Sequence, residues 1–192
     1  MRVFGIDPGS DRTGYGCVET DGSRHRIVQC GAIFSPTRGT FPDKLLAIHA
    51  QLAALIADCQ PHCVAIESLF YAANVRSALK LGHARGVAML AAVEAGLPVV
   101  EYTPAEIKRA VVGYGRAEKR QVQHMVKLIL GLPMPPSPHD AADALAVALC
   151  HVNSRVPSRV AGVLAAAHGT ATTKSWRHYR PTEHGRSRST GR

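Results

Sequence analysis

The chain has 192 residues, 46% of them hydrophobic and 19% charged, as is typical of a globular protein with one substantial core. No apolar run is long enough to cross a bilayer and no signal peptide follows Met1, so we expect no membrane association and a cytoplasmic location. The net charge of +9 favours a polyanionic partner.

The five cysteines are odd in number and scattered, which argues against a disulfide framework. Cys59, His62 and Cys63 resemble half of a zinc site, but no second cluster completes it. We therefore interpret the cysteines as buried, inert thiols.

Three strands are predicted at the start of the chain, over residues 2–7, 14–19 and 26–34. The short turns between them favour an antiparallel meander. Side chains alternate along a strand, so Asp7 is a carboxylate on one face at the end of an apolar run. A buried carboxylate is costly unless a cation or hydrogen-bond donors meet it.

A crossover helix over residues 42–59 leads to a short buried strand, 63–67, which also ends on a carboxylate, Glu67. If this strand is the neighbour of the first one, Asp7 and Glu67 lie on the same face within about 5 Å. The alternative, that Glu67 caps the next helix or pairs with a surface cation, remains open. Residues 97–102 predict a fifth strand.

The helix predicted over residues 75–95 is apolar or small on nearly every side, which suggests the sheet on one flank and a partner subunit on another. Its first turns carry Arg76 and Lys80, which we expect to contact DNA. The loop before it contains Phe70, one of the few aromatic residues.

Two further helices are predicted over residues 105–112 and 118–130, with basic residues around the glycine-flanked break between them. Lys108 and Lys119 belong to this group, which suits contacts with phosphate. A solvated polar helix face is the alternative explanation for any one of them.

The last predicted helix covers residues 139–151, and Asp140 and Asp143 lie three apart on one face of its first turn. Capping could explain one acid, but two on an otherwise apolar helix favour metal binding. His139 is an alternative ligand, a proton carrier or a residue without a role. We expect a domain over residues 1–152 and a basic, disordered tail over 153–192.

Four carboxylates thus lie at the ends of helices or strands that we expect to be buried: Asp7, Glu67, Asp140 and Asp143. Oxygen ligands suit Mg²⁺, with Mn²⁺ as an expected substitute, and a few carboxylates can hold two ions with phosphate completing the coordination. Two such ions can activate a water and stabilise the departing oxygen of a phosphodiester. The constellation predicts in-line phosphodiester hydrolysis.

The sequence resembles the bacterial RuvC family of Holliday-junction resolvases. The matching segments keep their order over residues 1–151; they are Gly5 to Gly9 with Thr13 to Gly16, Ile66 and Glu67 followed by Phe70 and Asn74, Ser77 to Gly86, Lys108, Val111 to Gly115, Ala117 to Val126, and Asp140 to Ala146. The resemblance implies an α/β, RNase H-like fold with a five-stranded mixed sheet, three antiparallel strands followed by parallel ones, and helices on both faces.

The resemblance also implies a homodimeric Mg²⁺-dependent endodeoxyribonuclease for recombination and DNA repair. It would cut two opposed strands of a four-way junction symmetrically, leave 5′-phosphate and 3′-hydroxyl nicks, and cooperate with the branch-migration proteins RuvA and RuvB. On matching positions, the four acids are the metal ligands and catalytic residues, Phe70 stacks on or wedges between bases, and Lys108 and Lys119 contact the backbone or the developing charge.

Two other classes of protein compete with this interpretation. Asp7 to Gly9, followed by Gly14, resemble the phosphate loop of actin-like ATPases, but those proteins need a second lobe for which this chain is too short. The other alternative is a junction-binding module without catalysis, which nicking assays distinguish from the enzyme.

Overall fold

The computed structural model of this protein describes residues 1–68 and 74–155. Their strands form one sheet; the strands are β1 (Arg2–Asp7), β2 (Arg12–Thr20), β3 (His25–Phe34), β4 (Cys63–Glu67) and β5 (Val99–Tyr102). The helices are α1 (Phe41–Cys59), α2 (Val75–Glu94), α3 (Pro104–Val112), α4 (Lys119–Ile129) and α5 (His139–Arg155). Phe70 lies outside the described residues.

The sheet has the strand order β3-β2-β1-β4-β5. The first three strands form an antiparallel meander, whereas β4 runs parallel to β1 and β5 runs parallel to β4. This confirms the predicted mixed sheet and the predicted pairing of the two strands that end on carboxylates.

Local sequence signals set where the helices begin. Thr40 caps α1 and forms a capping box with Asp43, and Thr103 does the same for α3 with Glu106. Each of these helices has proline at its start, where the missing N–H is not needed. The caps define how the chain enters each helix from the end of the preceding strand.

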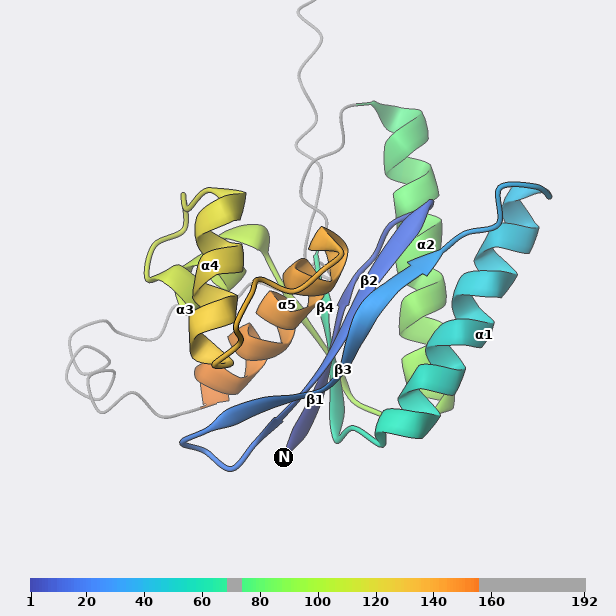
Figure 1. Ribbon diagram of the computed structural model, residues 1–192. Helices are drawn as coiled ribbons and strands as arrows, with labels where there is room; N and C mark the ends of the chain where they lie inside the picture. Colours follow the sequence, from blue (N-terminus) through green and yellow to red (C-terminus); the bar gives the residue numbers. More distant parts are fainter. Residues whose placement is uncertain (69–73, 156–192) are drawn as a thin grey trace, which may run out of the picture. The chain divides into compact units, whose positions relative to one another are not determined.

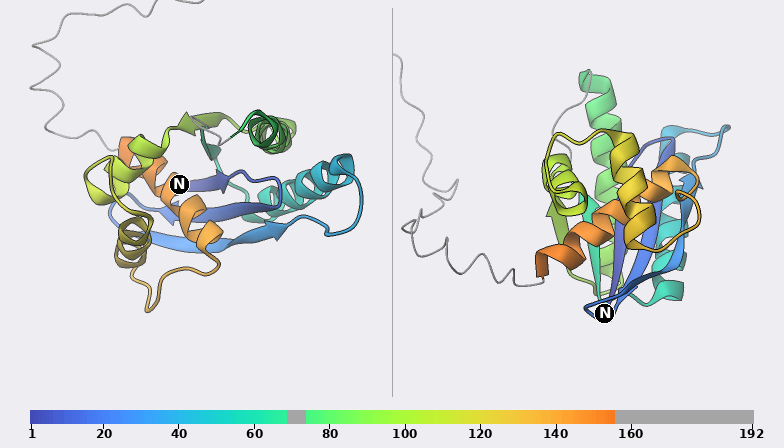
Figure 2. Two further views of the ribbon diagram at one scale, coloured as in Figure 1. Left: turned by 90° about the horizontal axis from the view of Figure 1, so that it is seen from above. Right: turned by 60° about the vertical axis from the view of Figure 1, so that its left-hand side comes forward.

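The helices cover both faces of the sheet, with α1 and α2 on one side and α3, α4 and α5 on the other (Figures 1 and 2). The alternation along β1 follows this division, because Phe4 and Ile6 pack in the α1–α2 core while Val3 packs in the core under α5. Asp7 lies four residues after Val3 on the same strand, so its side chain is also on the α5 face.

Glycines allow α5 to lie directly against the sheet. A Cβ atom at Gly5 would come within 2.1 Å of the backbone oxygen of Ala144, and one at Gly14 within 2.1 Å of the backbone oxygen of Asp140. Real Cβ atoms do not approach so closely, so these two positions require glycine for α5 to keep its place.

The remaining differences from the prediction are small. The helix α5 continues to Arg155, beyond the expected domain boundary at residue 152, and β2 begins already at Arg12 because that residue pairs with Phe34. The cysteines are free, and all but the half-buried Cys30 are buried. Among the described residues no helix has the length and apolar character needed to cross a membrane.

Candidate active site

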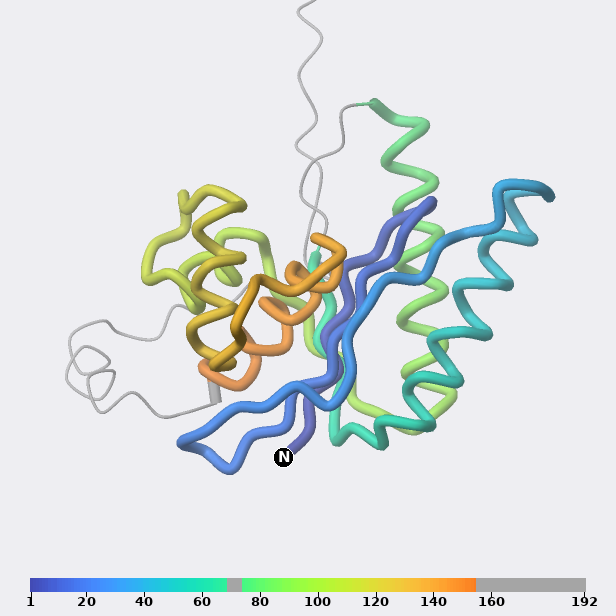
Figure 3. The backbone as a smooth tube through the Cα atoms, in the orientation of Figure 1, coloured from blue at the N-terminus to red at the C-terminus, as the bar shows by residue number. Residues whose placement is uncertain are grey.

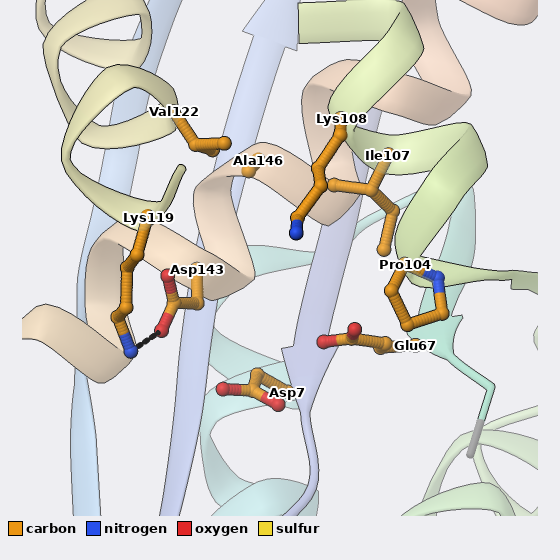
Figure 4. Close-up of a pocket in the computed structure, with 9 residues that line it drawn as sticks. All are labelled: Asp7, Glu67, Pro104, Ile107, Lys108, Lys119, Val122, Asp143 and Ala146. Atoms are coloured by element: carbon orange, nitrogen blue, oxygen red, sulfur yellow. Dashed lines mark ion pairs between the residues drawn. The ribbon is translucent and has the colours of Figure 1, made fainter. Parts of the chain in front are cut away.

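The ends of two neighbouring parallel strands bring Asp7 and Glu67 together. Ile6 pairs with Ile66 in the register of β1 and β4, so Asp7 and Glu67 occupy the next position on each strand. Both side chains line the same pocket, in which they point toward its centre (Figure 4). The structure therefore supports the predicted juxtaposition, and the interpretation of Glu67 as only a surface ion-pair residue is disfavoured.

The third carboxylate, Asp143, reaches this pocket from α5. The close contact of α5 with the glycines of β1 and β2 brings the first turns of the helix over the end of β1. Asp140 lies one turn earlier and does not line the pocket, although its charge acts on Asp7. The four predicted acids thus form one electrostatic cluster, of which three share the pocket.

The pocket has a volume of about 360 Å³ and combines acidic, basic and apolar walls. Its lining residues are Asp7, Glu67, Pro104, Ile107, Lys108, Lys119, Val122, Asp143 and Ala146. Lys108 comes from α3 and Lys119 from the first position of α4, so both predicted phosphate contacts face the carboxylates.

The carboxylates repel one another. Burial, followed by the charges of Glu67, Asp143 and Asp140, raises the pKa of Asp7 from 3.8 to about 8. Burial and the charge of Asp143 also raise the pKa of Glu67, while Lys108 and Lys119 act in the opposite direction. When the acids are ionised, three carboxylates line the pocket with only two lysines, which favours the entry of a cation.

Lys119 is the cation that lies nearest to Asp143. Its Nζ atom is 2.6 Å from Asp143 Oδ2, and the Lys119 side chain is 60% exposed. Although partial burial acts to lower the pKa of Lys119, the hydrogen bond and charge of Asp143 raise it above its ordinary value. The ammonium group neutralises Asp143 at the mouth of the pocket (Figure 4).

As the side chains lie, no group of three or more His, Cys, Asp or Glu residues within 1–68 and 74–155 is close enough to hold a metal ion. The chemistry of the donors nevertheless fits a hard divalent cation, because three carboxylates share the pocket and all are oxygen donors. Lys119 stands in for a cation beside Asp143. By the chemistry of their donor atoms, the residues present fit a hard divalent cation.

The other predicted site residues lie outside the pocket lining. His139 is exposed, and its Nδ1 atom is 3.0 Å from the side-chain amide of Gln123, so it faces α4. Arg76 and Lys80 are exposed in the first turns of α2. Lys80 extends over the Phe41 ring, with Nζ 5.9 Å from the ring centroid.

The sequence interpretation missed two groups of residues. Pro104, Ile107 and Val122 form the apolar walls of the pocket and show no distinctive sequence signal. Gly5 and Gly14 set the distance between α5 and the sheet, and a signal for them was present. Glycine interrupts two strands on the face that carries Asp7, which indicates a close backbone approach.

The family model described as "Crossover junction endodeoxyribonuclease RuvC" matches residues 3–151. The chain belongs to the RuvC family. A RuvC of Trichlorobacter lovleyi is 53% identical over 181 residues, covering 94% of this chain and 100% of that protein. A RuvC of Syntrophotalea carbinolica is 56% identical over 153 residues, covering 80% and 94% of the two chains.

A solved structure gives the same result for the fold. Thermus thermophilus RuvC, in complex with a Holliday junction substrate, matches with a TM-score of 0.77 and 37% identity, covering 80% of this chain and 94% of that one. The RNase H-like fold that the resemblance implied is confirmed by this match to a RuvC family structure.

Proposed function

We propose that Asp7, Glu67, Asp140 and Asp143 are the catalytic carboxylates of this chain. As a member of the RuvC family, the chain is a crossover junction endodeoxyribonuclease, a nuclease that resolves Holliday junctions in recombination and repair. The observation that carries the assignment is the pocket in which Asp7, Glu67 and Asp143 from three separate elements face two lysines.

We further propose Mg²⁺, replaceable by Mn²⁺, as the metal of this metal-dependent nuclease, with two ions in each subunit. When bound, such ions polarise a water molecule and the phosphate and stabilise the departing 3′ oxygen. The surroundings of Asp7 support this proposal, because a bound cation would favour the ionised carboxylate that burial and the neighbouring acids disfavour when they raise its pKa.

The two lysines would hold the substrate. Lys108 and Lys119 line the same pocket as the carboxylates, so both ammonium groups are available to a phosphate that enters it (Figure 4). Lys119 would exchange Asp143 for a phosphate oxygen as the cation enters. Pro104, Ile107 and Val122 would exclude bulk water from one side of the reacting phosphate.

A homodimer is the assembly that fits the exposed face of α2. Four apolar residues of this helix are strongly exposed, namely Val75 (76%), Leu79 (59%), Leu90 (50%) and Val93 (62%). Gly82 and Gly86 lie between Leu79 and Leu90 in the sequence, and all four residues line a groove of about 500 Å³. The absence of side chains at the two glycines would allow close approach of a second helix. Two subunits joined there would present two pockets to two opposed strands of one junction.

The remaining expectations stay proposals for this chain. We propose that it acts in the cytoplasm with RuvA and RuvB, that residues 1–152 with the last turn of α5 form the nuclease domain, and that the basic tail is a separate region. Truncation after Arg155 tests the division: the shortened chain should unfold with the urea midpoint of the full chain.

A nicking assay tests the function. The full chain is incubated with Mg²⁺ and either a synthetic four-way junction or a linear duplex of the same sequence. We expect paired nicks in the junction, ligatable ends and little cutting of the duplex. Equal cutting of both substrates would contradict structure selectivity, and binding without any nicking would favour the junction-binding module.

Asp7→Asn tests the site itself. We expect junction binding to persist and Mg²⁺-dependent nicking to be lost, because a ligand charge is removed while the side-chain shape remains. Asp58→Asn is the matched control, since Asp58 is an exposed carboxylate on α1 away from the pocket. Undiminished nicking by Asp7→Asn would refute the assignment.

The proposed contact of Phe70 with DNA bases is tested with a separate variant. We expect Phe70→Ala to weaken junction cleavage and to leave the urea midpoint unchanged, because stacking on bases is lost. A large loss of stability would instead identify Phe70 as a core residue.

A further inference from the structure

Two pairs of a cation and an aromatic ring lie at the end of the sheet that carries the carboxylates. Phe34, the last residue of β3, is 59% exposed, and the Arg12 guanidinium carbon is 5.8 Å from its ring centroid. Phe41, the first residue of α1, has Lys80 Nζ at 5.9 Å and makes an edge contact with His83. Neither ring is fully buried.

A third cation connects the two pairs. Lys44 Nζ is 2.9 Å from Asp11 Oδ1, and Asp11 directly precedes Arg12. The hydrogen bond and charge of Lys44, and in addition the charge of Lys80, hold the pKa of Asp11 below its ordinary value. Lys44 and Lys80 therefore act on one acid, with Arg12 as the next residue along the chain, so these three cations outnumber Asp11. We call Arg12, Phe34, Phe41, Lys44 and Lys80 the rim.

The strand register connects Arg12 and Phe34 to the active site. The other rim residues belong to α1 and α2, on the other face of the sheet, and meet this end of β2 through the Lys44–Asp11 ion pair. Asp7 pairs with Gly14, and Arg12, which pairs with Phe34, comes two residues before Gly14 on β2, about 7 Å away at the usual rise of a strand. Arg12 and Gly14 have the same parity, so Arg12 and Phe34 project on the face that carries Asp7. This end of the sheet also holds the β1–β2 turn, the end of β3 and the starts of α1 and α2 (Figure 3).

The rim and the two pocket lysines flank the carboxylates on different sides. Lys108 and Lys119 come from α3 and α4, whereas Arg12 and Phe34 come from the β2–β3 edge of the sheet. A DNA strand whose reacting phosphate lies at Asp7 would cross the two lysines on one side of that phosphate and the rim on the other side. The rim combines its cations with two aromatic rings.

The chemistry of the rim selects unpaired DNA over other partners. Cations bind phosphates, and exposed rings stack on bases that have lost their neighbours, a combination typical of surfaces that follow a single strand. A second copy of this chain would bring the same positive charges against each other. The apolar face of α2 is the better candidate for that partner.

We propose that the rim binds the unpaired DNA strand that leaves the carboxylate pocket on the β3 side, with its phosphates on Arg12, Lys44 and Lys80 and bases stacked on Phe34 and Phe41. This inference rests on the proposed nuclease function. It extends the substrate contact beyond the pocket to a surface that sets the path of the strand.

Binding measurements in EDTA, where no strand is cut, test the rim. We expect Phe34→Leu, which keeps an apolar side chain but removes the ring face, to weaken junction binding about fivefold or more. Arg12→Gln should weaken binding and lower the slope of log K against log salt by about one. Phe34→Tyr retains the ring and should bind like the unmodified chain.

Two variants at the opposite end of the same strands serve as controls. Arg24→Gln removes an exposed charge from the β2–β3 hairpin, and Val28→Ala removes an exposed apolar side chain from β3. Both should bind the junction normally. Unchanged binding by Phe34→Leu and Arg12→Gln, or losses no larger than those of the controls, would overturn the proposal.

The fluorescence of 2-aminopurine identifies the part of the DNA that is bound. The probe is placed beside the scissile phosphate, on one side or on the other, and stacking quenches it. We expect Phe34→Leu to abolish quenching of the probe on one side of the scissile phosphate only. If quenching persists at both probe positions, the proposed strand path is contradicted. Nicking by the unmodified chain in Mg²⁺ is scored separately, so a failure of the nuclease function is distinguishable from a failure of the rim.

Discussion

Asp7 is the residue whose ionisation depends most on its surroundings. Its pKa of about 8 lies above its ordinary value of 3.8, so between these pH values the native chain retains a proton that the unfolded chain has released. Metal-free stability should therefore fall as the pH rises through this interval. Urea unfolding in EDTA at several pH values, compared with Asp7→Asn, measures the effect.

The comparison with Asp7→Asn isolates this residue, since histidines and other groups titrate in both proteins. We expect the decline to be shallower in the variant and to diminish in the unmodified chain when Mg²⁺ is added. Parallel curves for the two proteins would show that folding does not raise the pKa of Asp7.

Lys119 provides a second prediction for a single residue. Lys119→Gln removes the ammonium that neutralises Asp143, so the carboxylate becomes free for a cation and the local negative charge increases. We expect half-maximal nicking at a lower Mg²⁺ concentration but a lower maximal rate, because a phosphate contact is also lost. A Mg²⁺ titration of the nicking rate measures both quantities.

Arg120→Gln is the control for Lys119, since the neighbouring Arg120 is exposed on α4 and does not line the pocket. It should leave both the Mg²⁺ requirement and the maximal rate unchanged. An increase in the Mg²⁺ requirement of Lys119→Gln would show that the lysine supports cation binding instead of competing with it.

Among the elements, α5 depends most on its contact with the sheet. Gly14→Ala would bring a methyl group against the backbone of Asp140, so α5 must shift, at a cost of about 1–3 kcal/mol. Asp140 and Asp143 would move with it, and nicking should fall by more than the loss of folded protein explains. Urea unfolding and nicking rates of the folded fraction measure the two effects.

Gly31→Ala is the matched control, because its added methyl group would meet only the outer part of the Tyr15 side chain. That side chain is half-buried and can move, so we expect about 1 kcal/mol or less and normal nicking. If Gly14→Ala nicks DNA normally, the close packing of α5 does not position the acids.

The sequence predicted the elements well where their signals are local. The caps, the period-2 strands and the apolar helix faces gave element bounds close to those observed, and the end of each strand at Asp7 and Glu67 indicated the site. The Lys119–Asp143 ion pair was not predictable in this way, because it depends on how α4 and α5 pack. That Asp143 lines the pocket and Asp140 does not was likewise not predictable, because it depends on how α5 packs on the sheet.

For the whole molecule, the exposed face of α2 predicts how two subunits associate. Leu79→Asp introduces a charge into this apolar face and should dissociate the dimer, because a buried unpaired charge is costly. Sedimentation should then report a monomer, and junction nicks should occur singly instead of in pairs. The control is Leu128→Asp on α4, where a leucine with a similar exposed fraction, 56%, lies outside the α2 face.

The order of the site residues along the chain has a consequence for biosynthesis. The sheet is complete once β5 has been made, but Asp140 and Asp143 belong to α5, the last helix among the described residues. A growing polypeptide on the ribosome therefore carries Asp7 and Glu67 before the two acids that are proposed to complete the site. Under that proposal, a fragment released by interrupted translation before α5 would lack two of the four carboxylates and should not nick DNA.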